Sequence, residues 1–433
     1  MSEWKLKKLG DLGIIKTGKT PSSKILGAFD LSGIPFITPK DMHNKKIVDN
    51  TERYLSPNGF EAVKNCVIPK NSVCVSCIGT VGLVVLTKES SITNQQINSL
   101  IVDENINNPD FLYYLLSSIK ETIKLLASSG SVVPILNKTD FSKIQVKIPN
   151  KKTQDTISSY LKCLDDKITL NTQTNQTLEQ IAQGIFKHWF IDFAPIHAKA
   201  NALARGETTE QAELAAMACL SGKTVEKITA LKTQDPTAYH QLQQTAAAFP
   251  SEFVETEMGE VPKGWEWLKI EQVIKKIPVG KKYSQKNTFP EGHIPVLDQG
   301  KSGIIGFHND TAGVNASIQD PVIVFANHTC YMRLIHFDFS AIQNVFAFKG
   351  QNVNIYWLYL ATLGKQKFVE YKGHFPDFLI KQIVVPPKEL TEIFGNIVKD
   401  SFSKIALNLN TNEKLAKTRD LLLPRVLSGE IEL

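Results

Sequence analysis

The sequence predicts an α+β protein in which two α/β heads are separated by two long antiparallel helices, which form a coiled-coil spacer with pseudo-two-fold symmetry. Three observations support this prediction. A long helical pattern occurs twice at a constant offset, a mixed strand-and-helix segment precedes each copy, and the framework of the first such segment recurs in the second. Apolar residues at steps of three and four over about four heptads are typical of a coiled-coil seam.

The two helical copies share polar as well as apolar seam positions. Asn171 in the first copy corresponds to Asn408 in the second. Asn175 corresponds in the same way to Asn412. Asparagines inside a seam fix its register at some cost in stability, so we expect Asn171 to face Asn412 and Asn175 to face Asn408. The predicted helix seam comprises Leu161, Ile168, Asn171, Asn175, Leu178, Val398, Ile405, Asn408, Asn412 and Leu415.

Turn residues and apolar runs divide the chain into five segments. Within the first segment, 34–38, 72–78 and 83–87 are expected to be strands, and 109–127 is expected to be a helix. The predicted segments are head one (1–150), the first long helix (151–194), an Ala- and Gln-rich helical insertion with its linker (195–259), head two (260–387), and the second long helix with the C-terminal tail (388–433).

Composition narrows the possible functions only slightly. The net charge of +6 comes with a basic surplus in both heads, which suits a polyanionic partner without proving one. No apolar run reaches membrane-spanning length and no signal peptide opens the chain, so we expect a cytoplasmic protein. Cys74 and Cys77 have CxxC spacing but lie in an apolar run, which favours a buried strand over a metal or redox site.

One motif resembles a catalytic site. Gly13–Thr20 matches the phosphate-loop pattern GxxxxGK[ST], so a P-loop nucleotide hydrolase is one alternative function. Against it, Pro21 follows where a helix should begin, and the corresponding stretch of head two lacks the pattern. We predict no catalytic residue and no metal site, and we expect Asp165 and Asp166 to lie on a solvated helix face. Another possible function is that of a structural adaptor, in which the coiled coil joins other proteins and the chain does not bind DNA.

Aromatic residues gather near the end of the first long helix. The cluster comprises Phe186, Trp189, Phe190 and Phe193, which the pattern places on an exposed face. Such a patch either packs on head two or serves as a docking site, and the sequence favours neither.

Taken in order, several short motifs carry a family resemblance over nearly the whole chain. The sequence resembles the specificity subunit of a type I restriction–modification system. The motifs are Gly18–Pro21, Ile34–Ile37, Thr93–Gln95, Gly130–Asn137, Gln154–Phe190, Met258–Trp265 and Leu423–Gly429.

The resemblance implies that each head is a target-recognition domain that reads one half of a bipartite, asymmetric DNA sequence. The long helices would act as a spacer ruler and as docking surfaces for two methylation subunits, and restriction or motor subunits would join this core. The resemblance implies no cofactor in this chain, with S-adenosylmethionine, ATP and magnesium belonging to the partner subunits. The recognition subunit of a fused-nuclease methylation system would share the same design.

Residues able to contact DNA occur on the expected turns of both heads. Phosphates are bound by cationic, hydroxyl or amide donors, guanine by Arg or Lys, and adenine by Asn or Gln. An ordinary surface or capping role is the alternative for each residue. The predicted DNA-binding residues are Lys19, Thr38, Lys40, Lys45, Asn94, Gln95, Ser131, Asn137 and Lys138 in head one, and Lys281, Lys282, Tyr283, Gln299, Lys301, Asn327, His328, Arg333, Lys372 and His374 in head two.

Overall fold

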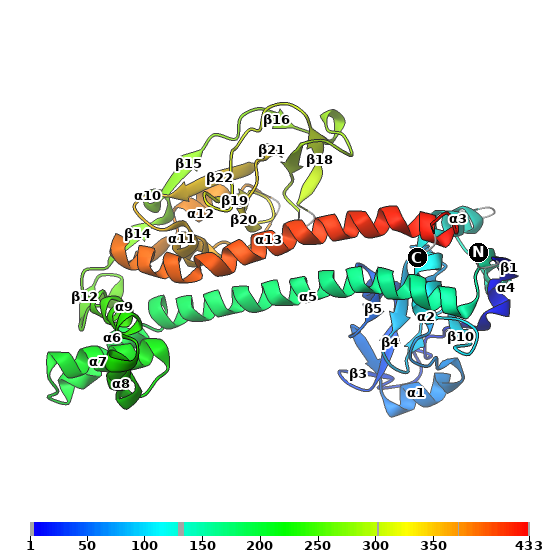
Figure 1. Ribbon diagram of the computed structural model, residues 1–433, viewed down its shortest axis with the longest axis horizontal. Helices are drawn as coiled ribbons and strands as arrows, with labels where there is room; N and C mark the ends of the chain where they lie inside the picture. Colours follow the sequence, from blue (N-terminus) through cyan, green and yellow to red (C-terminus); the bar gives the residue numbers. More distant parts are fainter. Residues whose placement is uncertain (1–3, 129–133, 301–302, 371, 432–433) are drawn as a thin grey trace. The chain divides into compact units, whose positions relative to one another are not determined.

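A computed structural model of the chain describes residues 4–128, 134–300, 303–370 and 372–431 (Figure 1). The chain forms two compact units: unit 1 is Met1–Leu170 with Thr411–Leu433, and unit 2 is Asn171–Asn410. Two helices of 40 residues each, α5 (Lys151–Phe190) and α13 (Lys388–Leu427), contribute a segment to both units. The expected α+β class with a long helix pair is therefore confirmed.

The described residues of head one, 4–128 and 134–150, form two sheets and a short strand pair. Its strands are β1 (Lys5–Lys8), β2 (Gly13–Thr17), β3 (Phe29–Asp30), β4 (Ile34–Ile37), β5 (Ile47–Val48), β6 (Arg53–Leu55), β7 (Val73–Ser76), β8 (Val84–Thr87), β9 (Ile92–Thr93), β10 (Ile97–Val102) and β11 (Gln145–Ile148). The larger sheet has the order β2-β10-β7-β8-β5, the smaller one β3-β6-β4-β9, and β1 pairs with β11. Fully buried Val73, Leu100 and Phe111 belong to the core of the larger sheet.

The helices of head one are α1 (Pro57–Val63), α2 (Pro109–Ser118), α3 (Lys120–Ala127) and α4 (Lys138–Lys143). The expectation of one helix over 109–127 was wrong in one respect, because Ile119 leaves the helical conformation and separates α2 from α3. Asn108 caps α2 by accepting a hydrogen bond from the Phe111 amide.

Head two, in unit 2, is built on a similar plan. Its strands are β14 (Glu266–Lys269), β15 (Ile274–Ile277), β16 (Lys282–Tyr283), β17 (Ile294–Leu297), β18 (Ile304–His308), β19 (Val322–Ala326), β20 (Met332–Ile335), β21 (Ser340–Ile342), β22 (Val345–Gly350) and β23 (Gln382–Val385). They form the sheets β15-β22-β19-β20 and β16-β21-β17-β18 and the pair β14-β23. Its helices are α10 (Ile270–Val273), α11 (Ile355–Thr362) and α12 (Phe375–Leu379).

Both heads begin and end in the same way. The first strand pairs antiparallel with the last, β1 with β11 in head one and β14 with β23 in head two. A long helix follows directly, since α5 begins at Lys151 and α13 at Lys388. The entry and exit of each head therefore lie side by side at the start of a long helix.

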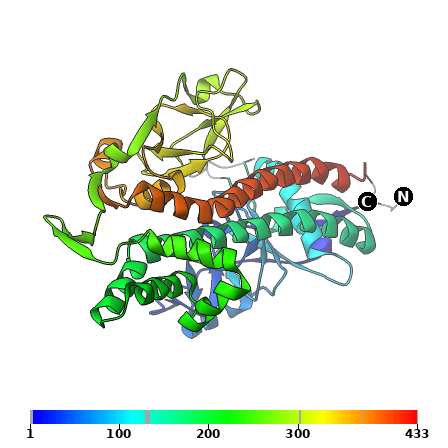
Figure 2. The same ribbon diagram turned by 60° about the vertical axis from the view of Figure 1, so that its left-hand side comes forward.

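A helical insertion separates α5 from head two. It contains α6 (Ala194–Ala204), α7 (Thr209–Ser221), α8 (Val225–Gln234) and α9 (Pro236–Ala247), followed by the hairpin of β12 (Phe253–Thr256) and β13 (Gly259–Pro262). Figure 2 shows the four helices grouped beside the end of α5. Buried Lys199 fastens this group because its amine donates to Glu213 at 2.6 Å and to the Phe249 carbonyl at 2.8 Å.

Within each unit the segments of α5 and α13 pack antiparallel. In unit 2, Asn408 Nδ2 donates to Asn175 Oδ1 at 2.8 Å, the contact expected from the asparagine register. In unit 1, Asn412 Nδ2 donates to the Ile168 carbonyl at 3.4 Å. Of the other seam residues, Leu161, Asn171 and Val398 are buried, whereas Leu178, Ile405 and Leu415 are half-buried. No helix in the described ranges has the length and apolarity needed to cross a membrane.

The asparagine pair leads to a stability prediction. Replacing Asn408 alone by leucine is expected to lower the free energy of unfolding by about 1–3 kcal/mol, because buried Asn175 Oδ1 loses its donor. Replacing both asparagines by leucine is expected to recover that loss, since an apolar pair needs no hydrogen bond. Urea denaturation of the full chain measures both effects. A single variant as stable as the double variant would refute the role assigned to the pair.

The aromatic cluster at the end of α5 is buried, so its predicted exposure was wrong. Phe186, Trp189 and Phe190 are 8%, 4% and 5% exposed. Phe190 lies 5.8 Å from the ring of Trp265 and 5.3 Å from that of Phe394. Of the two roles left open by the sequence, packing on head two is the one observed.

Candidate nucleic-acid interface

Three loops of head one are joined at the ends of its strands. Beyond β2, the Lys19 amide donates to the Thr93 carbonyl at 2.9 Å, and the Thr20 hydroxyl donates to Gln95 Oε1 at 2.6 Å. Gly18 permits this contact, because a Cβ at that position would lie 2.1 Å from the Thr93 oxygen. The loop leading to α4 joins the group through Asn98 Nδ2, which donates to the Leu136 carbonyl at 3.1 Å.

Some of the predicted DNA-binding residues of head one expose their side chains near these loops. Lys19, Gln95 and Lys138 are exposed, so their amine or amide groups can reach a ligand. Lys40 is also exposed and lies 3.8 Å from Glu52, an exposed pairing of little strength.

The other predicted residues of head one have structural bonds. Thr38 Oγ1 donates to Asp41 at 2.7 Å, and buried Asn94 bonds to the backbone and side chain of Gln96. Asn137 caps α4 by accepting from the Asp140 amide at 2.9 Å. The Lys45 amine donates to Asp49 at 2.7 Å, and this hydrogen bond lowers the pKa of that carboxyl. Ser131 and, in head two, Lys301 lie outside the described residues.

At β16 of head two, predicted residues form a compact cluster. The Tyr283 ring stacks on His308 with centroids 4.1 Å apart, and its hydroxyl donates to Asp310 at 2.8 Å. The Lys281 amine lies 2.8 Å from the same carboxylate. The hydrogen bonds from Lys281 and Tyr283 lower the pKa of Asp310. Lys282 is exposed beside this cluster.

A second group of head-two loops meets around His328. Its backbone amide donates to Gln299 Oε1 at 2.9 Å, and its Nδ1 lies 2.9 Å from the Lys372 carbonyl. Asn327 Oδ1 accepts from the Phe375 amide at 2.8 Å. Asn327 and His374 are only 8% and 0% exposed, so these two side chains hold the loops together and do not present groups to solvent.

The remaining two cations of head two differ in accessibility. Arg333 donates to the carbonyls of Gly303 and Asp298, each at 3.0 Å, and thereby links the end of β17 to the start of β18. Burial lowers the pKa of Arg333. Lys372 is exposed, although it lies 3.2 Å from Glu370 and 3.5 Å from Asp377.

The phosphate-loop motif does not form a phosphate loop. Gly13 begins strand β2 and pairs with Val102 of β10, so more than half of the motif is sheet. No helix begins at Lys19 or Thr20, both of which lie in a described stretch. The P-loop alternative therefore lacks the strand–loop–helix geometry that nucleotide phosphates require.

The CxxC pair was considered as a possible metal or redox site. Cys74 and Cys77 are buried at β7, and burial raises the pKa of their thiols to about 12 and about 11. The expected buried strand is thus observed at this CxxC spacing. In the described ranges, no three His, Cys, Asp or Glu side chains gather as they would to hold a metal ion.

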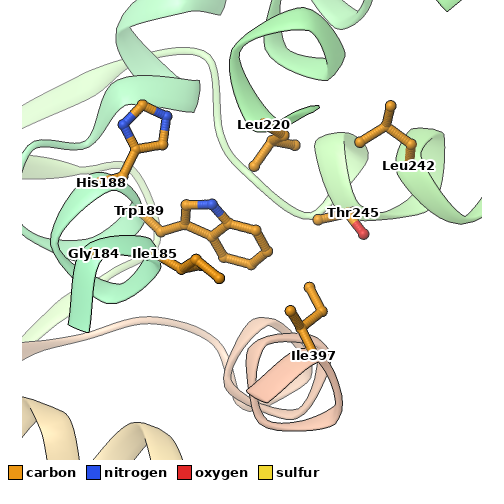
Figure 3. Close-up of a pocket in the computed structure, with 8 residues that line it drawn as sticks. All are labelled: Gly184, Ile185, His188, Trp189, Leu220, Leu242, Thr245 and Ile397. Atoms are coloured by element: carbon orange, nitrogen blue, oxygen red, sulfur yellow. The ribbon is translucent and has the colours of Figure 1, made fainter. Parts of the chain in front are cut away.

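A cavity of about 500 Å³ lies in unit 2, where the insertion meets the long helices (Figure 3). No Lys or Arg is found among its lining residues, so it offers no charge to a phosphate. His188 at its edge is 3.4 Å from the sulfur of Cys219. The lining residues are Gly184, Ile185, His188, Trp189, Leu220, Leu242, Thr245 and Ile397.

The sequence reasoning missed one group of residues in head one. Lys46, Asp110, Tyr114 and Asp165 form a partly buried polar network with Arg419 of α13. The Lys46 amine is held inside this group, where it donates to the Tyr114 hydroxyl and pairs with Asp110. The only signal in the sequence was the presence of charged residues, Asp165 and Arg419, close to the predicted helix seam.

Comparisons with known proteins identify the family. Residues 1–180 match the family described as type I restriction modification DNA specificity domain. The chain is 33% identical to the type I restriction enzyme HindI specificity subunit of Haemophilus influenzae, with 100% of both proteins covered. It is 25% identical to the MjaIX specificity subunit of Methanocaldococcus jannaschii over 99% of this chain and 94% of that protein.

A solved structure shares the fold. The crystal structure of a type I restriction–modification S subunit from M. genitalium matches with a TM-score of 0.55 and 14% sequence identity, covering 98% of this chain and 96% of that one. The full-length similarity to the H. influenzae protein establishes the relationship: the chain belongs to the family of type I restriction enzyme specificity subunits.

Proposed function

We propose that this chain supplies DNA sequence specificity to a type I restriction–modification complex by binding a bipartite, asymmetric target through its two heads. One observation carries the proposal: the heads share a strand framework, whereas the side chains on their loops differ. The order β2-β10-β7-β8 in head one corresponds to β15-β22-β19-β20 in head two. Different loops on a common framework suit the reading of two different half-sites.

The domain boundaries proposed from the sequence remain 1–150 and 260–387 for the two target-recognition domains. In head one, exposed Lys19, Lys40 and Lys138 would contact phosphates, and Gln95 would read a base edge. Buried Asn94 would fix the loop that presents Gln95.

In head two, exposed Lys281, Lys282 and Lys372 are the proposed phosphate contacts. Residues that are bonded inside the head would instead hold the loops in shape. The residues with this second role are Tyr283, Gln299, Asn327, Arg333 and His374.

Two methylation subunits are the proposed partners on the long helices. Exposed apolar residues recur at equivalent positions, since Tyr160 and Leu170 on α5 correspond to Ile397 and Leu407 on α13. Such repeated exposed apolar positions suit two copies of one partner. Restriction or motor subunits would join this core. Methylation and cleavage would take place in the partners, which would bind S-adenosylmethionine, ATP and magnesium.

Methylation mapping tests the proposal. DNA is taken from cells that express this chain together with its methylating partner, and modified adenines are located by long-read sequencing. We expect N6-methyladenine in one asymmetric split motif, and its loss when this chain is omitted. Unchanged methylation without this chain, by a partner shown to be active, would favour the coiled-coil adaptor without DNA binding.

A further inference from the structure

A partly buried ionic network joins head one to both long helices. Asp165 on α5 has a side chain only 12% exposed, so the expectation of a solvated position was wrong. Its Oδ1 accepts from Arg419 Nη1 of α13 at 2.7 Å, and its Oδ2 accepts from the Tyr114 hydroxyl of α2 at 2.5 Å. One carboxylate therefore bonds to a helix of the head and to the other long helix, all within unit 1.

A second cation extends this network into the sheet of head one. Lys46, which immediately precedes β5, donates to the Tyr114 hydroxyl at 2.8 Å and lies 2.8 Å from Asp110. Its amine also lies 3.7 Å from Asp165 and 4.4 Å from the centre of the Tyr114 ring. We name Lys46, Asp110, Tyr114, Asp165 and Arg419 the head-one joint.

The corresponding joint of head two has the opposite chemistry. The offset that relates Asn175 to Asn412 also relates Asp165 to Phe402 and Ala182 to Arg419. Phe402 stacks on Tyr356 of α11 with centroids 5.0 Å apart. Counted from the capping asparagines Asn108 and Asn354, Tyr356 occupies the position of Asp110. Aromatic packing thus stands in head two where charges stand in head one.

The two chemistries constrain orientation differently. Buried ion pairs add little net stability compared with apolar packing, because desolvation of the charges offsets their attraction. Their hydrogen bonds are directional, however, and a buried charge left without its partner is costly. A small rotation of head one would break several such bonds at once, whereas a smooth aromatic contact tolerates sliding better.

We propose that Asp165 and Tyr114 are positioning residues that fix the orientation of head one on the long helices, and that they thereby restrict the number of base pairs between the two half-sites. The inference rests on the proposed function. Each base pair added to a spacer moves a half-site by roughly 3.4 Å and turns it by roughly 35° on B-DNA. A head whose orientation is fixed cannot reach the displaced half-site, whereas a head that can rotate binds it in part.

The test compares methylation maps of complexes that carry single substitutions. Asp165→Asn removes the charge that Arg419 meets on α5, although Arg419 keeps its second partner Asp420, and Tyr114→Phe removes only the hydroxyl between Lys46 and Asp165. Asp166→Asn is the matched control, since it makes the same chemical change at the neighbouring exposed residue. For each variant, methylation is counted at sites with the wild-type half-sites and with spacers of the native length or one base pair longer or shorter.

For Asp165→Asn we expect the methylated fraction at altered spacers to rise by about tenfold, because one charge-assisted hydrogen bond network is lost. Tyr114→Phe should give a smaller rise, and Asp166→Asn none. Half-site sequences should stay the same in every case. If Asp165→Asn does not assemble into a folded complex, Tyr114→Phe decides the question, because it keeps the buried ring and all four charged residues of the joint.

Unchanged spacer discrimination in Tyr114→Phe and in any folded Asp165→Asn complex would overturn the inference. The proposed function would remain intact in that case, since the wild-type complex would still methylate a split motif. An absence of split-motif methylation that depends on the wild-type chain would instead refute the proposed function. The two failures are therefore distinguishable from the same set of maps.

Discussion

Replacing Phe394 by alanine is expected to lower the free energy of unfolding by about 3–5 kcal/mol, the range typical for truncating a buried aromatic side chain. Phe394 is 0% exposed. Its ring lies 5.8 Å from that of Phe186, 5.9 Å from Trp189 and 5.3 Å from Phe190. The substitution would leave a cavity at the point in unit 2 where α13 packs on the end of α5.

Tryptophan fluorescence during denaturation measures this loss, because Trp189 reports directly on the cluster. Ile397→Ala is the matched control, one turn further along α13, at a side chain that is 47% exposed. Its effect should be clearly smaller, at about 1 kcal/mol, because about half of the Ile397 side chain is already in solvent. Equal stability of the two variants would contradict the role assigned to the aromatic cluster.

The double substitution of Lys19 and Lys138 by alanine is expected to weaken DNA binding by the assembled complex at every sequence. Each lysine that neutralises a phosphate contributes about 0.9 to the slope of log affinity against log salt concentration. The double variant should therefore have a slope smaller by about 1.8. Binding titrations at several salt concentrations, with target and non-target duplexes, give this slope.

Lys143→Ala provides the comparison on the same short helix as Lys138. The Lys143 amine lies 3.5 Å from Asp140, and the residue was not predicted to contact DNA. We expect its salt slope to equal that of the wild-type protein. If the double variant also retains the wild-type slope, these two lysines do not contact phosphates.

The long helices were predictable because their determinants are periodic. Seam spacing and the repeated asparagines indicated both α5 and α13, and the bond between Asn175 and Asn408 follows from the register proposed. Strands at 34–38, 72–78 and 83–87 were also recognisable as short apolar runs between turns, and β4, β7 and β8 lie within them. The helices and strands depend on nearby residues, so the sequence indicates them directly, and the repeated asparagines indicate the register between two helices that are distant in the chain.

Contacts between residues that are distant in the chain were harder to predict from the sequence. Asp165 and Arg419 are 254 positions apart in the chain, so nothing near Asp165 shows that it is paired. The aromatic residues at the end of α5 face outward in the isolated helix and become buried only when Trp265 and Phe394 pack on them. Similarly, the loops around His328 are held by bonds between segments that the sequence could not place together.

An exchange of heads tests whether each head reads one half-site. Residues 1–150 are replaced by the corresponding segment of a family member whose methylated motif is known, and the methylation of the hybrid complex is mapped. We expect one half of the split motif to change to that of the donor, while the other half is retained. A motif that stays wholly unchanged, or one in which both halves change, would show that the heads do not each read one half-site.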